Sequence, residues 1–173
     1  YTVIVRQLNG NAEEMVFSTR YGFREVERRG NLIYVNGKRE YFKGVNTQDI
    51  HPLYGHAIDV PTMLKDVVLM KQANVNTVRT SHYPRQPKMY AMFDYYGLYC
   101  MDEADIECHG YQKISNVPSW RNAYVDRTRR MVLRDRNHPS VVFWSLGNEA
   151  GGGCNFDASY DCVKQLLPGR DAI

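Results

Sequence analysis

The stretch Ser140-Val141-Val142-Phe143-Trp144-Ser145-Leu146-Gly147-Asn148-Glu149 decides how the rest of this sequence folds. Its apolar part is rich in β-branched and aromatic residues and is bounded by Pro139 on one side and by three glycines on the other. A short apolar run with such boundaries predicts a fully buried β-strand. Asn148 and Glu149 would then lie at the carboxyl end of that strand, where parallel α/β folds place their binding sites. Taken alone, an Asn-Glu pair is also typical of an ordinary surface turn.

The sequence on either side of this strand alternates between strand and helix patterns. Strands are predicted at 75–80, 98–101 and 140–145, and helices at 59–70, 87–96, 119–135 and 156–167. Asp59 before Pro61 is a typical helix start, and Gly97 is a typical helix stop. With a first strand that runs into Gly44, the order is βαβαβαβα, which predicts an α/β fold with a parallel sheet. Periodicity alone leaves two architectures open, the first half of a (β/α)8 TIM barrel and a doubly wound sheet.

The first 29 residues follow another pattern, in which no helix is predicted. Two alternating apolar runs, at 1–8 and 15–23, flank Asn9-Gly10, and this dipeptide is a strong hairpin signal. We expect residues 1–29 to be the last strands of an immunoglobulin-like β-sandwich, followed by a barrel domain over 30–173. A second hairpin is expected around Asn36-Gly37, between strands at 32–35 and 39–45.

Composition excludes few classes of protein. The chain has 173 residues, is 43% hydrophobic and 24% charged, and carries a net charge of +3, which suits an ordinary globular domain. Five arginines between 127 and 136 are interleaved with aspartates on a predicted helix, so we interpret them as a salt-bridged surface and expect no nucleic-acid partner. No apolar run reaches the length that spans a bilayer, so no membrane partner is expected. The chain opens without Met inside a strand pattern, which leaves a cytoplasmic or a periplasmic location open.

The cysteines show no metal-binding or redox spacing. There is no CxxC pair and no His-x-x-x-His, which argues against a structural zinc site. We therefore predict four free thiols, at Cys100, Cys108, Cys154 and Cys162.

Polar clusters follow all four predicted barrel strands. They comprise residues 46–56, Ser81-His82-Tyr83-Pro84, residues 102–110, and Asn148-Glu149. Carboxyl ends of parallel strands meet at one face of a barrel, where enzymes of this fold hold their chemistry. The coincidence favours a functional site over four unrelated turns. By the same argument His138 precedes its strand and is interpreted as structural, whereas His51 and His56 lie on the correct face.

Four motifs in this order resemble those of glycoside hydrolase family 2. They are residues 42–46 (FKGVN), 76–84 (NTVRTSHYP), 102–110 (DEADIECHG) and 135–149 (DRNHPSVVFWSLGNE). The match runs through essentially the whole chain. Within the family, Ile106-Glu107-Cys108-His109-Gly110 is more similar to the β-galactosidases than to β-glucuronidases or β-mannosidases.

The resemblance implies a retaining β-glycosidase that hydrolyses terminal β-D-galactose, with sandwich domains before its barrel. It implies that Glu149 is the general acid/base and that Asn148 hydrogen-bonds the sugar 2-hydroxyl. His82, His109 and Asp102 are expected to contact substrate. Glu107, His109 and Glu149 are expected to hold Mg2+, which carboxylates suit.

Other residues receive supporting roles. Arg79 is interpreted as the partner of an active-site carboxylate, and Asp102 and Glu103 could also orient the ligating groups. Thr47-Gln48 departs from the Arg-His of β-galactosidases, and Gln48 cannot become cationic, which puts in doubt either the galactose preference or the tightness of the transition-state contact.

The nucleophile of a retaining mechanism is expected to lie outside the chain, because no carboxylate here matches the family's nucleophile motif. We therefore expect an inactive fragment that carries the acid/base half of an enzyme, with open sheet edges that favour a homo-oligomer. The alternatives are a β-glucuronidase or another family 2 β-glycosidase, a non-catalytic carbohydrate-binding fragment, and a structural piece that associates through its edges.

Overall fold

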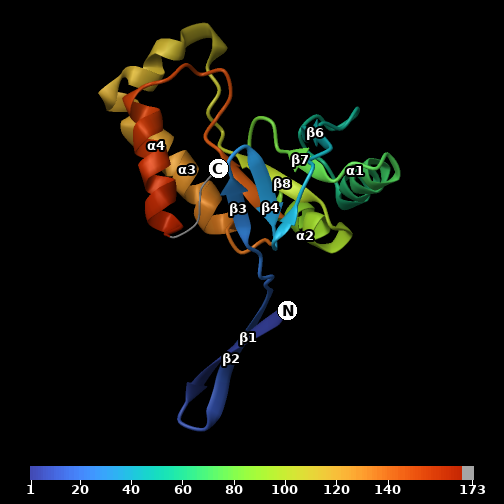
Figure 1. The fold of residues 1–173 in the computed structure, drawn as a ribbon. Helices are drawn as coiled ribbons and strands as arrows, with labels where there is room; N and C mark the ends of the chain where they lie inside the picture. Colours follow the sequence, from blue (N-terminus) through green and yellow to red (C-terminus); the bar gives the residue numbers. More distant parts are fainter. Residues whose placement is uncertain (169–173) are drawn as a thin grey trace.

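The computed structural model describes residues 1–168, and a parallel sheet lies at its centre (Figure 1). Its strands are β6 (Gly44–Asn46), β7 (Thr77–Arg79), β8 (Tyr99–Glu103) and β9 (Val141–Ser145), paired in that order. The helices that alternate with them are α1 (Val60–Gln72), α2 (Pro87–Tyr96), α3 (Arg121–Asp135) and α4 (Cys154–Leu166). The predicted βα order is confirmed. Sequential strand order is typical of a TIM barrel, because a doubly wound sheet reverses its order at one point.

Local signals place the ends of the first two helices where the sequence predicts them. The Asp59 side chain caps α1 by accepting a hydrogen bond from the Thr62 backbone N–H at 2.9 Å. Helix α2 ends at Gly97, whose φ of 68° lies in the left-handed region that glycine adopts without strain.

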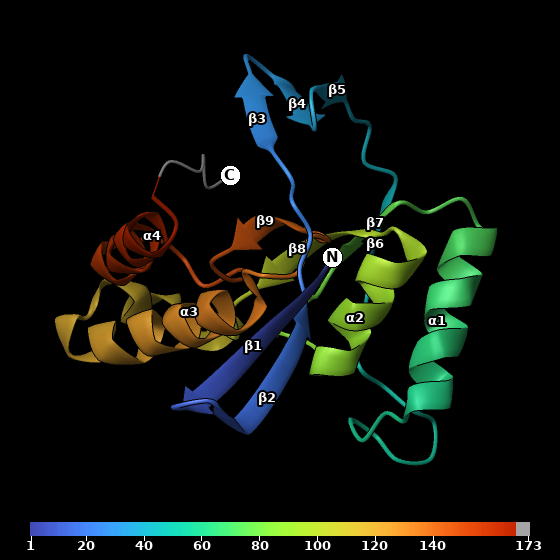
Figure 2. The same cartoon turned by 90° about the horizontal axis from the view of Figure 1, so that it is seen from below.

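The helices pack in two neighbouring pairs along the sheet, α1 with α2 and α3 with α4 (Figure 2). Under the first pair lies a core that includes Met63, Val67, Tyr90, Phe93 and Val141. The second core includes Ile106, Tyr124, Val132 and Val163. Trp144 packs against both cores, so β9 connects them.

The chain between β8 and α3 differs from the prediction. Two 3-10 helices, η1 (His109–Asn116) and η2 (Pro118–Trp120), precede α3, which begins at Arg121 rather than at 119. Helix α4, by contrast, begins two residues earlier than predicted, at Cys154, and ends at Leu166, one residue before the predicted end. The excursion over 104–120 stands above the strand ends (Figure 1) and carries the motif from Asp105 to Gly110.

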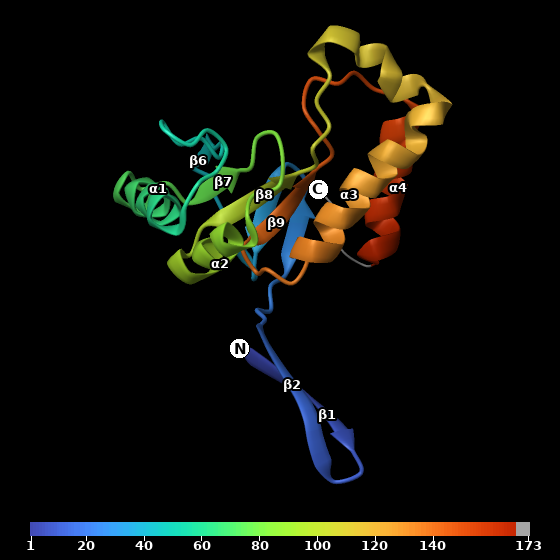
Figure 3. The same ribbon diagram turned by 180° about the vertical axis from the view of Figure 1, so that it is seen from behind.

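The N-terminal residues form two antiparallel units. Strands β1 (Thr2–Asn9) and β2 (Ala12–Arg20) make a hairpin that projects away from the body (Figures 1 and 3). Strands β3 (Val26–Arg29), β4 (Leu32–Val35) and β5 (Lys38–Arg39) form a second sheet. The predicted boundary after residue 29 therefore falls in the turn between β3 and β4. Membership of residues 1–29 in a sandwich stays a prediction.

The predicted continuous strand over 39–45 is wrong. Its start pairs with β4 as β5, and its end joins the parallel sheet as β6. Asn76 explains the division, because its side chain accepts from the Lys43 N–H at 2.7 Å and donates to the Tyr41 carbonyl at 2.9 Å. These bonds hold residues 41–43 against the start of β7 and leave them unavailable for a hairpin.

Three smaller expectations can be compared with the structure. All four cysteines are free, as predicted. Three arginines of α3 pair with acidic neighbours, Arg127 with Asp105 at 2.8 Å, Arg130 with Asp126 at 2.8 Å and Arg134 with Asp135 at 2.7 Å. Among residues 1–168, no helix is long and apolar enough to cross a membrane.

Candidate active site

Glu103, the last residue of β8, is the buried centre of the site. Its side chain is fully buried and receives two bonds from Arg79, from Nε at 2.6 Å and from Nη2 at 3.0 Å. The Ser145 hydroxyl at the end of β9 donates to it at 2.7 Å, and His82 Nδ1 lies 2.7 Å away. A buried carboxylate is stable only when it is paired and hydrogen-bonded, and these groups meet that need. Glu103 therefore ties together the ends of β7, β8 and β9.

Asn148 is oriented by charges on both sides of its amide. Arg79 Nη2 donates to Asn148 Oδ1 at 2.8 Å, and Asn148 Nδ2 donates to Glu107 Oε1 at 3.1 Å. Its backbone N–H also donates to the Ile106 carbonyl at 2.9 Å. Because a cation faces the oxygen and a carboxylate faces the nitrogen, the amide cannot rotate without losing both partners. The predicted partnership of Arg79 with an active-site carboxylate is present, and it extends to Asn148.

Glu149 projects from the next position into the open. Its side chain is 66% exposed, and Oε2 lies 2.7 Å from His109 Nε2. Its φ of 41° is in the left-handed region, which is unusual for a residue with a side chain and recurs at functional sites. Gln112 of η1 donates to the Glu149 carbonyl at 2.8 Å and holds this turn. An open cleft of about 320 Å3 lies against residues 146–153, so the carboxyl group is accessible.

His82 and Glu107 complete the group of polar side chains. His82 is 21% exposed, and its Nε2 lies 3.8 Å from Glu107 Oε1 while its Nδ1 faces Glu103. His109 Nδ1 lies 3.5 Å from the same Glu107 oxygen. The structure therefore brings His82, Asn148, His109, Glu107 and Glu149 together at the carboxyl ends of the strands.

The expected magnesium ligands meet in a way that does not suit a cation. Glu107 faces Nδ1 of His109 and Glu149 faces Nε2, so the imidazole ring lies between the two carboxylates. A bound cation would instead need both carboxylates and one ring nitrogen around a common point. No cluster of three His, Cys, Asp or Glu side chains among residues 1–168 has the geometry to hold a metal ion. The donor set as arranged therefore does not fit Mg2+.

The expectation that Asp102 contacts substrate does not fit the structure. Asp102 is 0% exposed and faces the helices, where it accepts bonds from the Tyr90 hydroxyl at 2.6 Å and from Thr80 Oγ1 at 3.3 Å. Successive side chains of a strand point to opposite faces, so Glu103 points into the site and Asp102 points away from it. Burial and the neighbouring Asp135 raise the pKa of Asp102 well above its usual range.

The remaining histidines have structural partners. His138 Nδ1 lies 2.6 Å from Asp94 at the opposite end of the sheet, in agreement with its structural interpretation. His56 Nδ1 lies 2.8 Å from the Asp49 carbonyl, and His51 stacks on Tyr54 with ring centroids 4.5 Å apart.

Sequence reasoning missed three contributors to the site. Ser145 could have been found, because it ends β9 with a hydroxyl in an otherwise apolar run. Gln112 lies on the unpredicted η1. Arg85 is fully buried and donates to the carbonyls of Ser81, Tyr83 and Thr47, which joins the loops after β6 and β7. No pattern in the sequence distinguishes it from an exposed arginine.

Comparison with known proteins places this geometry in a family. Residues 26–172 match the family model described as glycosyl hydrolases family 2, TIM barrel domain. The solved β-glucuronidase of Ruminococcus gnavus is similar to this chain in its complex with D-glucuronic acid (TM-score 0.87, 26% identity, 96% of this chain and 29% of that chain). The apo form gives a TM-score of 0.80 at 29% identity over 96% and 28% of the two chains.

The complex of that enzyme with uronic isofagomine gives a TM-score of 0.80 at 27% identity, over 96% of this chain and 29% of that chain. The chain thus spans less than a third of the length of these solved relatives. The family expected from the motifs is confirmed, whereas these structural neighbours are β-glucuronidases and not β-galactosidases. This chain belongs to glycoside hydrolase family 2 and contributes strands and helices of its TIM-barrel domain.

Proposed function

We propose that this chain is the acid/base-bearing part of a retaining β-glycosidase whose substrate is a β-glucuronide. The observation that carries the proposal is the position of Glu149, an accessible carboxyl group at the end of β9 beside an amide oriented by Arg79 and Glu107. The family match supports the reaction class, and the similarity to R. gnavus β-glucuronidase supports the sugar.

The reaction proceeds in two displacements. Glu149 donates its proton to the glycosidic oxygen as a second carboxylate attacks the anomeric carbon, which releases the aglycone and forms a glycosyl-enzyme. Glu149, now ionised, removes a proton from water, and the water oxygen attacks the same carbon and frees the nucleophile. His109 Nε2 lies 2.7 Å from the Glu149 carboxyl group and positions it.

The polar side chains around Glu149 bind and orient the sugar. The second N–H of Asn148 is suited to the sugar 2-hydroxyl, because its other polar atoms are occupied by Arg79 and Glu107. His82 presents Nε2 toward the same region, with Nδ1 held by Glu103. The second carboxylate would belong to a part of the enzyme outside this chain, which covers 29% of the R. gnavus β-glucuronidase chain.

A β-galactoside is the second candidate substrate, favoured by Ile106-Glu107-Cys108-His109-Gly110. Against it stands Gln48, where the β-galactosidase pattern has a residue that can carry charge. A carbohydrate-binding fragment without catalysis is a third candidate. Such a fragment would need a polar, sugar-sized site but no proton donor. The accessible carboxyl group of Glu149 is therefore a feature that sugar binding alone does not require.

The test is a substrate panel. The full-length enzyme is assayed on aryl β-glucuronide, β-galactoside and β-mannoside with the same leaving group, beside its Glu149→Gln variant. We expect the highest kcat/KM on the glucuronide, with at least a hundred-fold loss in the variant, the scale of general acid/base catalysis. A higher kcat/KM on the galactoside would contradict the glucuronide proposal and support a β-galactoside as the substrate. The absence of turnover on all three, with sugar binding retained, would support the binding fragment.

A further inference from the structure

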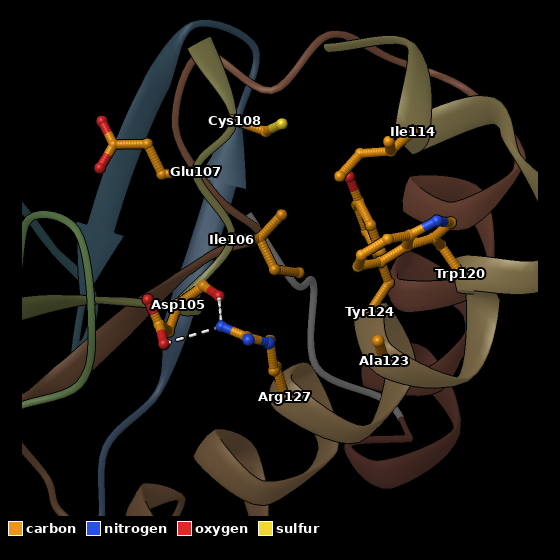
Figure 4. A pocket seen from close by; sticks show the side chains of 9 residues that line it. All are labelled: Asp105, Ile106, Glu107, Cys108, Ile114, Trp120, Ala123, Tyr124 and Arg127. Carbon is orange, nitrogen blue, oxygen red and sulfur yellow. Dashed lines mark hydrogen bonds and ion pairs between the residues drawn. The ribbon is translucent and has the colours of Figure 1, made fainter. Parts of the chain in front are cut away.

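A cavity outside the active site lies between the β8–η1 segment and the start of α3 (Figure 4). Its volume is about 140 Å3. Ile106 forms one wall and Ile114, Trp120 and Ala123 form the other, so the walls are mainly apolar. The Arg127–Asp105 ion pair, at 2.8 Å, closes one end.

Glu107 separates this cavity from the active site. Figure 4 shows the Glu107 carboxylate directed away from the cavity, whereas the Ile106 side chain points into it. Glu107 Oε1 instead accepts from Asn148. The two residues therefore present opposite faces of one segment, as alternation in an extended chain requires. An occupant of the cavity would contact the rear of the segment that holds Glu107.

Tyr124 indicates what such an occupant must offer. The residue is 3% exposed, and its hydroxyl is buried without a hydrogen-bond partner in the described structure. Figure 4 shows the phenol oxygen at the cavity, near Ile114. Buried polar groups in proteins nearly always have a partner, and an unsatisfied one is costly. A ligand with an oxygen at this point would satisfy the Tyr124 hydroxyl.

We propose that this cavity is a binding site for a small aromatic alcohol of the size of phenol. The volume supports the size, because an apolar cavity of about 150 Å3 accommodates benzene. The apolar walls and Trp120 suit an aromatic ring. The Tyr124 hydroxyl supplies one directional bond to the ligand oxygen. The site is independent of the glycosidase proposal, because Glu107 is the one lining residue with a role in that reaction and its carboxylate is directed away from the cavity.

The experiment compares phenol with benzene, which has the same ring but no oxygen. Both are titrated into the full-length enzyme, and dissociation constants are measured by NMR. We expect saturable binding of both, with phenol the tighter. Tyr124→Phe keeps the ring and removes the donor, so it should weaken phenol binding by roughly two- to ten-fold and leave benzene unchanged.

A second pair of variants locates the site. Ala123→Leu, on an exposed position of α3, should fill the cavity and abolish saturable binding of both ligands. Ala91→Leu makes the same change on an exposed position of α2, far from the cavity, and should leave both affinities unchanged. The inference is overturned if neither ligand binds saturably, if binding survives Ala123→Leu, or if Tyr124→Phe leaves the ratio of phenol to benzene affinity unchanged. If Ala123→Leu does not fold, the test is the ratio of phenol to benzene affinity in Tyr124→Phe compared with that ratio in the wild type.

Discussion

Glu103 has no contact with solvent, yet its charge organises the whole active site. Replacing it with Ala would leave the Arg79 guanidinium largely buried without its carboxylate, because the pair is joined at 2.6 and 3.0 Å. We expect a loss of about 3 kcal/mol in the free energy of unfolding, the usual cost of breaking a buried ion pair. Urea denaturation measures it. Glu27→Ala is the matched control, since it removes an exposed pair with Arg29 that is worth less than about 1 kcal/mol.

Asp102 predicts a pH dependence of stability. Its folded pKa is raised by burial and by Asp135, so the folded protein binds this proton more tightly than the unfolded chain does. Its contribution to stability is therefore complete below the unfolded pKa of about 4 and is lost as pH rises through the folded pKa. The variant Asp102→Asn serves as the reference, because its amide side chain cannot ionise.

The free energy of unfolding of wild type minus that of Asp102→Asn should accordingly fall between pH 4 and the folded pKa. Urea denaturation at a series of pH values measures this difference. A difference that stays constant or rises with pH over that range would contradict the assignment of a raised pKa.

At this scale the sequence indicated most of the site residues but not their contacts. His82, Asn148, Glu107, His109 and Glu149 follow strands of one parallel sheet, so topology alone brings them to one face. The sequence does not say which of Asp102 and Glu103 points inward, because that depends on where β8 begins. It also does not show that the ring of His109 lies between two carboxylates.

The turn after β9 depends on a glycine that the sequence alone does not distinguish from its neighbours. Gly147 has a φ of 154°, and a Cβ there would lie 2.5 Å from the Ile106 carbonyl oxygen. Gly147→Ala should therefore displace Asn148 and cost about 2 kcal/mol in stability, with a large fall in kcat. Gly152→Ala is the control, because a Cβ at that position meets nothing within 4 Å. Thermal denaturation and steady-state kinetics of both variants measure the effects, and equal behaviour would refute this role.

Elements with strong local signals were predicted well. Helices α1 and α2 were expected correctly because a capping Asp59, an early proline and a terminal Gly97 act on their own neighbours. The strand over 39–45 was predicted wrongly because its division depends on Asn76, which is distant in sequence. Helices η1 and η2 were missed because their sequences showed no repeating pattern of apolar residues from which a helix was predicted. A long-range contact therefore accounts for the error over 39–45, and the lack of a local signal accounts for the missed 3-10 helices.

At the scale of the whole molecule, the arrangement of His109 predicts that activity does not require Mg2+. The ring lies between Glu107 and Glu149, so their carboxylates are not directed at a common point. We expect the full-length enzyme to retain its kcat/KM after exhaustive treatment with EDTA. A loss of activity that Mg2+ restores and that Glu107→Gln weakens would instead support the magnesium site expected from the family resemblance.

The central claim is that Glu149 is the acid/base of a retaining enzyme, and one product analysis tests it. In full-length Glu149→Gly, an activated aryl leaving group departs without a proton, and the glycosyl-enzyme accumulates because no base activates water. Azide needs no base, so it should attack the anomeric carbon, displace the enzyme carboxylate and restore turnover. Glu107→Gln, a neighbouring carboxylate variant, should show no such rescue. The account predicts a glycosyl azide of β configuration, whereas an α product, or no rescue at all, would contradict it.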